Sequence, residues 1–496
     1  MNRTNRLRIS QRSGVGGIIK NKTNQRGRAS IAVALVAALF SLSFAFTILI
    51  FVRVGILSSS EVTPLQPSAQ VVPGAPGAPW KGALAKGAND VIIADDDDDD
   101  DALMSDQFRD WAATILADLH LIAIDTSGMK RDENENRKGA AYRGVRASFC
   151  KLNWDLYKMD PPALPMFKFL VSKSGCDDVK NVMTVDLAAA VRKTKEFDDA
   201  IRARHQSRNH NAGGIHVISP SGFVFHESRV GSTLVANALT AMDPERHRVY
   251  SESNPINVAL KACEGRPASA CDAASNAELL RDVVHLMGRT SSPRERFLFF
   301  KVASNGSLRI GMMRQAFPSV PWIFVYRDPV QTMMSHLAPT KELAWDDRGE
   351  VPPALCLRYK SNPPDDLVQL VNGHDENVDE LSDEEFCAAQ LATLCESALC
   401  AMTNPDSHGI AVEYDNLIEK LIRNVIPNHF GIRVDETARQ HILNIAKIYS
   451  KSRTGDRDWA EDGGSKDARS TPEIRVASTK FLSRSYSKLK ECSMAM

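Results

Sequence analysis

The chain has 496 residues with 61 basic and 61 acidic side chains, so its formal net charge is zero. This balance argues against wholesale nucleic-acid binding, which needs a basic face, and we expect no nucleic-acid partner. It also hides an asymmetry, because the first 28 residues carry basic charges only, whereas residues 95–101 are an unbroken run of aspartates. These two segments roughly cancel, and the rest of the chain is close to neutral.

Residues 29–52 contain no charged side chain and are dominated by Ala, Val, Leu, Ile and Phe. A helix of that length spans the hydrocarbon core of a bilayer, which is about 30 Å thick. The basic segment before it predicts that residues 1–28 are a cytosolic tail and that the remainder is lumenal. We therefore predict a single-pass signal anchor that ties the chain to the membrane. A cleaved signal peptide is the alternative, although its apolar region is usually shorter.

Residues 53–102 are rich in Pro, Gly, Ala and Ser and lack the apolar periodicity that a core requires. We interpret them as a disordered stem that holds a catalytic head away from the membrane. The aspartate run is interpreted as a solvated linker, with a calcium or basic-partner site as the alternative. Residues 103–214 contain helical patterns and are predicted to be folded and mostly helical, with a role that no motif assigns.

The nine cysteines are an odd number, so at least one is free or pairs between chains. A lumenal head lies in an oxidising compartment, and no pair has the CxxC spacing of a zinc site, so disulfides are the favoured role. Cys263 and Cys271 are close enough in sequence to close a small loop. A second cluster comprises Cys356, Cys387, Cys395 and Cys400. The pairing and the oligomeric state, a homodimer included, stay open at this stage.

From residue 215 onward, short β-rich runs alternate with helical patterns. The candidate strands are 222–225, 248–251, 297–302, 322–326 and 410–412. Helical patterns lie between them, for example at 233–241 and 308–316. This alternation predicts an α/β domain over residues 215–496, with a parallel sheet that is flanked by helices on both faces.

The most informative motif is FVFHESRVGSTLVANAL at 223–239. An apolar run ends in a polar turn with Arg229, Val230 and Gly231, and a helical pattern starts at Ser232 and Thr233. A strand–turn–helix unit presents backbone N–H groups and the positive end of the helix dipole to an anion. The nucleotide-triphosphate P-loop places a lysine after its last glycine, and none follows Gly231. The loop therefore predicts an anion site that is not built for Mg-ATP.

A second motif is WIFVYRDPVQTMMSHL at 322–337. A β-rich run ends in Arg327, Pro329 opens a helix, and Ser335 lies eight residues after Arg327. At the carboxyl edge of a parallel sheet both side chains reach one group, and a second phosphate is the natural ligand. The alternative is that Arg327 pairs with Asp328 or with another acid.

Together these motifs resemble the sulfotransferase family that uses 3′-phosphoadenosine-5′-phosphosulfate, over residues 215–489. The family loop (R/K)xG(S/T)(T/S) matches residues 229–233, which the resemblance implies bind the 5′-phosphosulfate. It also implies that Arg327 and Ser335 bind the 3′-phosphate. Tyr414 and Asp415, in the segment AVEYDNLIEK, match a later element of the family. The implied fold is a P-loop NTPase-like sulfotransferase fold, and the implied reaction needs no metal.

Two further residues resemble the catalytic pair of the protein-tyrosine branch of this family. Glu252 follows the strand at 248–251 and would take the proton from an acceptor hydroxyl. Lys301 would neutralise charge on the bridging oxygen as the phosphate leaves, and Arg229 is counted with this pair as catalytic. The alternatives are a glutamate that orders a loop and a lysine that snorkels from a buried strand. Lys466, near the C-terminus, matches the family's basic loop poorly, and His226 is interpreted as structural.

These expectations combine into a type II Golgi membrane enzyme whose lumenal head transfers a sulfuryl group to a hydroxyl of a glycan or glycoprotein. Sulfation of a protein tyrosine is the nearest rival function. A nucleotide-dependent kinase and a non-catalytic membrane-tethered binding protein are the rivals from other classes.

Overall fold

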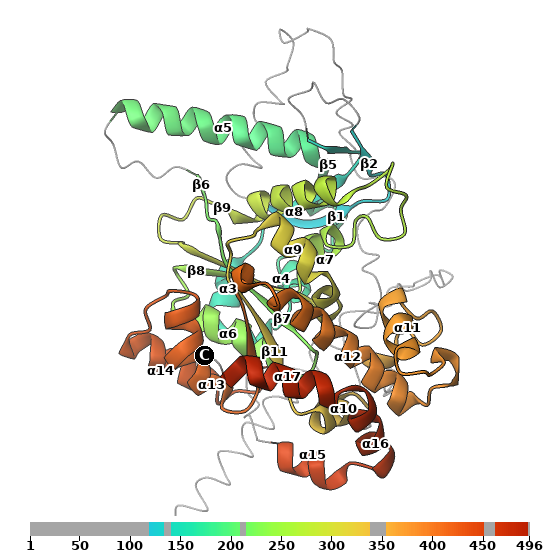
Figure 1. Cartoon of the computed structure of the whole chain (residues 1–496). Coiled ribbons are helices and arrows are strands. Elements are labelled where there is room, and N and C mark those ends of the chain that lie inside the picture. The colour runs from blue at the N-terminus through green and yellow to red at the C-terminus, as the bar shows by residue number, and fades with distance from the viewer. Residues whose placement is uncertain (1–118, 133–139, 209–214, 338–353, 451–461, 495–496) are drawn as a thin grey trace, which may run out of the picture. The chain divides into compact units, whose positions relative to one another are not determined.

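A computed structural model describes residues 119–132, 140–208, 215–337, 354–450 and 462–494 (Figure 1). The chain divides into the units Met1–Val72 and Pro73–Met496, and every described residue belongs to the second. The predicted tail, membrane helix and stem, with residues 103–118, lie outside the described residues. None of the helices in the described ranges is long and apolar enough to cross a bilayer.

Five parallel strands form the central sheet, in the order β12-β11-β7-β10-β8. The strands are β7 (Pro220–His226), β8 (His247–Ser251), β10 (Phe297–Lys301), β11 (Trp322–Tyr326) and β12 (Gly409–Glu413). The strands β10 and β11 are near-continuous apolar runs, FLFFK and WIFVY, because both faces of a parallel sheet are covered. The predicted α/β class and the predicted strand positions are confirmed.

The direction of the crossovers explains how helices come to cover both faces of this sheet. The connection from β7 to β8 contains α6 (Ser232–Met242) and crosses the sheet in one direction. The connections that contain α9 (Ile310–Ala316) and α12 (Asp383–Met402) lead from β10 to β11 and from β11 to β12, in the other direction. Right-handed crossovers therefore place α6 on one face and α9 and α12 on the other. In agreement, α6 packs against α14 (Glu436–Ile445), whereas α9 packs against α12.

The remaining elements are short connections and peripheral helices. The other helices are α3 (Trp154–Met159), α4 (Phe167–Lys173), α5 (Leu187–Arg208), α7 (Asn254–Ala259), α8 (Ala273–Gly288), α10 (Pro329–Leu337), α11 (Asp365–Asn372), α13 (Leu417–Lys420), α15 (Gly463–Arg469), α16 (Pro472–Phe481) and α17 (Ser483–Met494). The other strands are β1 (His120–Asp125), β2 (Lys130–Arg131), β3 (Tyr142–Arg143), β4 (Arg146–Cys150), β5 (Met183–Asp186), β6 (His216–Val217) and β9 (Arg289–Thr290). Two 3₁₀ helices border the site described below, η3 (Ser304–Arg309) and η5 (Leu355–Leu357).

The described part of the region before residue 215 contains helices, of which α5 is the longest, and also an antiparallel sheet that was not predicted. The strands of this antiparallel sheet have the order β1-β4-β5. In the sequence, the helices α3 and α4 lie between β4 and β5. Residues 121–124 of β1 are buried one after another, which is the pattern of a covered strand rather than of an amphipathic helix. The region joins the central sheet closely, since β1 packs on α7 and α8, and the Ser251 hydroxyl donates to the Pro165 carbonyl (2.9 Å).

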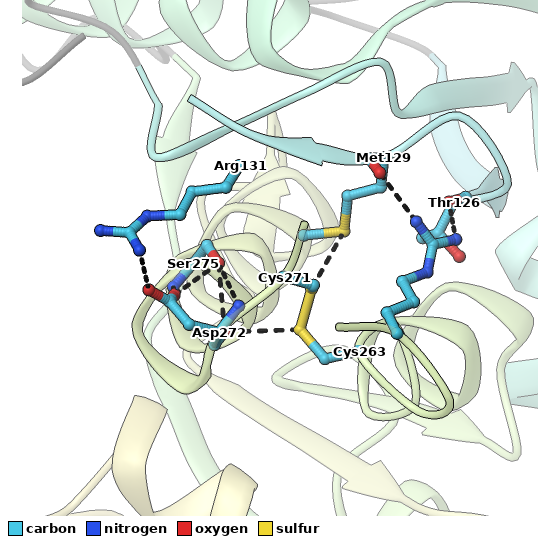
Figure 2. The surroundings of a disulfide bond; sticks show 8 residues. Thr126, Met129, Arg131, Cys263, Cys271, Asp272 and Ser275 are labelled. Atoms are coloured by element: carbon cyan, nitrogen blue, oxygen red, sulfur yellow. Dashed lines mark hydrogen bonds and ion pairs between the residues drawn. A yellow bond between two sulfur atoms is a disulfide. The ribbon is translucent and has the colours of Figure 1, made fainter. Parts of the chain in front are cut away.

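Three disulfides staple the described part of the chain, Cys150–Cys176, Cys263–Cys271 and Cys356–Cys387. The small loop predicted for the second pair is confirmed, and the later cysteine cluster yields one bond and two free thiols. Figure 2 shows the loop against the turn that follows β1, where Cys271 Sγ lies 3.9 Å from Met129 Sδ. The disulfide therefore fixes the loop between α7 and α8 at its contact with the antiparallel sheet.

Candidate active site

The loop between β7 and α6 has the anion-binding geometry that the sequence predicts. It follows the central strand of the sheet, and α6 begins at Ser232 with Gly231 as its N-cap. Three loop residues have positive φ, Ser228 at 100°, Arg229 at 58° and Gly231 at 83°. A Cβ on Gly231 would also lie 2.6 Å from the Tyr414 ring, so both the backbone conformation and the space require glycine here. The first N–H groups of α6 then face the turn without helical partners.

One cavity of about 160 Å³ brings together nearly all of the side chains that the sequence selected. From the sequence prediction it is lined by Arg229, Val230, Gly231, Ser232, Thr233, Glu252, Arg327 and Ser335. The carboxyl ends of β7, β8 and β11 therefore converge on one opening, as expected at the edge of a parallel sheet. Lys301 does not line the cavity and reaches it through Glu252.

Arg327 and Ser335 both line the cavity and are linked through Gln331. The Arg327 guanidinium is buried, donates to Gln331 Oε1 (2.9 Å) and lies over the Tyr414 ring at 4.2 Å. The Ser335 hydroxyl donates to the Gln331 carbonyl (2.8 Å). The acid that pairs with Arg327 is Asp462 (2.9 Å), which comes from a segment 135 residues later.

Arg327 and Lys466 both contact Asp462, and no sequence motif indicated this meeting. Lys466 of α15 contacts the second carboxylate oxygen of Asp462 at 2.5 Å. Burial lowers the pKa of Lys466, and the positive charges of Arg327 and Arg229 lower it further. Three cationic side chains, Arg229, Arg327 and Lys466, line the cavity with two carboxylates, Asp462 and Glu252, and Glu252 is already paired with Lys301. This excess of positive charge favours a bound anion. The only sequence signal for α15 is its basic, glycine-containing segment GGSKDAR.

Glu252 and Lys301 meet at the ends of two neighbouring strands. Ser251 and Lys301 are register partners in β8 and β10, and the Glu252 N–H donates to the Lys301 carbonyl (2.7 Å). The Lys301 ammonium pairs directly with Glu252 Oε1. The lysine is 1% exposed and the glutamate side chain 21%, so the carboxylate faces the opening and the cation lies behind it. Glu252 has a positive φ of 54°, a backbone strain that is often found at functional positions.

The cavity is also lined by His226 and by several residues that no motif indicated. His226 lines it, but its ring Nε2 lies 3.0 Å from the Val302 carbonyl, in agreement with a structural role. The cavity wall also includes Met166, Leu355, Tyr449 and Ser450, which no motif indicated. In the part of the chain that the structure describes, no group of three His, Cys, Asp or Glu side chains is placed to hold a metal ion.

No family model and no curated protein matches the chain. Among solved structures it is similar to sulfotransferase STF9 from Mycobacterium avium, with 14% identity and a TM-score of 0.28 over 56% of this chain and 84% of that one. A sulfotransferase from Alicyclobacillus acidocaldarius has 12% identity and a TM-score of 0.29, with 56% and 97% covered. Mouse sulfotransferase SULT7A1, solved in complex with PAP, has 11% identity and a TM-score of 0.29, with 56% and 91% covered. Likeness at this level decides neither fold nor chemistry, which rest on the geometry above.

Proposed function

We propose that this protein transfers a sulfuryl group from 3′-phosphoadenosine-5′-phosphosulfate to an acceptor hydroxyl. The observation that carries the proposal is the single cavity that joins two separate anion sites, the loop at Arg229 and the pair Arg327 and Ser335. A nucleoside that carries phosphate on both the 3′ and the 5′ oxygen of its ribose suits such a cavity. A carboxylate with a buried lysine behind it lines the same opening.

In this proposal each end of the donor has its own set of ligands. The N–H groups at the start of α6, with Arg229, Ser232 and Thr233, hold the 5′-phosphosulfate. Arg327 and Ser335 hold the 3′-phosphate, and the Tyr414 ring fixes the plane of the guanidinium at 4.2 Å. The bound phosphate then takes the place that Asp462 occupies against Arg327.

The proposed chemistry is an in-line displacement at sulfur. The acceptor oxygen attacks sulfur while Glu252 takes the hydroxyl proton, and the bond from sulfur to the bridging oxygen breaks. The negative charge that develops on that phosphate oxygen is stabilised by Arg229, and the buried Lys301 adds its positive charge from behind Glu252. The products are the sulfated acceptor and adenosine 3′,5′-bisphosphate, and the proton remains on Glu252 until it is lost to solvent.

The proposed acceptor is a hydroxyl of a glycan or glycoprotein in the Golgi lumen. The apolar segment 29–52 supports a membrane-anchored, lumenal head. The three disulfides of the described residues support an oxidising compartment. Tyrosine is the second candidate acceptor, and the direct pair between Glu252 and Lys301 favours it.

The test uses the detergent-solubilised full chain with a donor labelled in its sulfuryl group and a panel of glycans and tyrosine peptides. We expect label in one acceptor class, and Arg229→Ala should abolish the transfer. Competition by Mg-ATP, with no effect of adenosine 3′,5′-bisphosphate, would point to a kinase instead. Bisphosphate binding without turnover on any acceptor would point to a binding protein.

A further inference from the structure

Glu227 is a buried acid that lies between the two anion sites and that the proposed chemistry does not use. It is 1% exposed, whereas its neighbours His226 and Ser228 line the cavity. Its N–H donates to the Val325 carbonyl (3.1 Å), and its Oε2 accepts from the N–H of Arg327 (3.4 Å). One residue therefore joins the loop after β7 to the end of β11 through both its backbone and its side chain.

A third element reaches the same carboxyl group. The thiol of Cys395, on α12, lies beside it and is itself buried. The titratable groups that face this pocket are Asp328 after β11, Cys395 and Glu396 on α12, and Tyr326 of β11. Burial raises the pKa of Glu227 to about 8, and the nearby Asp328 adds to the rise. Near pH 7 the carboxyl is therefore neutral, although it directly precedes a loop that is built to bind anions.

We propose that Glu227 is a positioning residue that holds Arg327 in register with the β7–α6 loop, and that it does so in its protonated form. This proposal rests on the proposed function, because the ligand that it affects is the doubly phosphorylated donor. A neutral carboxyl keeps its hydrogen bonds without placing a negative charge behind the anion site. Loss of the proton adds that charge and weakens donor binding.

The binding experiment measures the affinity of the full chain for adenosine 3′,5′-bisphosphate between pH 6.5 and 9. For the natural protein we expect at least a threefold loss of affinity above pH 8. Glu227→Gln should bind within threefold of the natural protein at pH 7 and lose less affinity at high pH. Lys466 also has a lowered pKa, but it titrates in both proteins, so their difference isolates Glu227. Glu227→Leu should bind about tenfold more weakly than the natural protein at pH 7, since it removes the buried hydrogen bond from the Arg327 N–H, and like Glu227→Gln it should lose less affinity at high pH.

Equal pH profiles for the natural protein and Glu227→Gln would overturn the role of protonation. Natural affinity in Glu227→Leu would overturn the positioning role. A second readout, amide hydrogen exchange of Arg327 without ligand, separates this proposal from the proposed function. Exchange at that amide should become at least tenfold faster in Glu227→Leu and stay near natural in Glu227→Gln. If the natural protein fails to bind the bisphosphate, the proposed function is lost, and the exchange result still decides the positioning role.

Discussion

The pair Arg327 and Asp462 leads to the sharpest prediction, because its two partners should act in opposite directions. Asp462 and the 3′-phosphate would compete for one guanidinium, which now donates to Asp462 at 2.9 Å. We therefore expect Arg327→Ala to weaken binding of adenosine 3′,5′-bisphosphate and Asp462→Asn to strengthen it. Asparagine keeps the size of the aspartate and removes only its charge, so it tests the competition itself.

The expected magnitudes follow from burial. Arg327 is 5% exposed, and each of its hydrogen bonds to phosphate is worth about 1.5–3 kcal/mol, so its loss should weaken binding by roughly 10-fold or more. The Asp462 side chain is 49% exposed, so solvent screens its pair and the release is worth at most about 1 kcal/mol. Asp462→Asn should therefore tighten binding by no more than about fivefold.

Isothermal titration calorimetry with the bisphosphate at low and at moderate salt measures both effects. The gain from Asp462→Asn should shrink as salt rises, because the competing pair is itself screened. Weaker binding by both variants would refute the competition and show that Asp462 instead organises Arg327 and Lys466 for the ligand. Unchanged binding by Arg327→Ala would remove the arginine from the site.

Three further predictions concern the loop, the catalytic pair and the buried acid. Gly231→Ala should lower the unfolding free energy by ~2–5 kcal/mol in denaturant titration, owing to its φ of 83° and its close neighbour, while Gly311→Ala, with open space around it, should not. Lys301→Met and Glu252→Gln should each lower kcat by about 10²-fold or more with a smaller change in donor KM; near-normal kcat for either one removes its assigned role. The raised pKa of Glu227 means that the native state keeps a proton that the unfolded chain releases, so stability should fall as pH rises from 4.5 to about 8, by on the order of 5 kcal/mol in total. Glu227→Gln should lack this part of the fall, and equal slopes for the two proteins between pH 5 and 8 would contradict the shifted pKa.

Local pattern was enough to predict much of the central sheet and its loop. The runs FLFFK and WIFVY are short, continuous and rich in aromatic residues, and their alternation with helical patterns favours covered strands. Arg327 and Ser335, eight residues apart, line the same cavity, because a strand end that is followed directly by a helix has little conformational freedom. In contrast, β1 was not predicted, because a short apolar run fits either a helix or a strand until its partner strand is known.

The missed residues share a physical reason. Asp462 contacts Arg327, and Lys466 contacts Asp462, although both lie more than 130 residues after Arg327 in the sequence. No local pattern predicts contacts over such a separation. The protonation state of Glu227 could not be predicted either. An acid in a polar turn is expected to be solvated, and only the packing of α12, with Cys395, shows that this one is buried. Burial and charge neighbours set protonation, and both depend on segments that are distant in sequence.

The sequence by itself determined the strand–turn–helix that ends in Gly231, the arginine at the end of β11 and the alternation that builds a parallel sheet. These depend on local conformation and on the period of apolar residues, which neighbouring residues specify. Only the tertiary structure decided that these strand ends line one cavity and that Lys301 lies behind Glu252. It also decided that Arg327 is paired with the carboxylate of Asp462. Those facts arise from long-range packing, which removes water from the charges and chooses their partners.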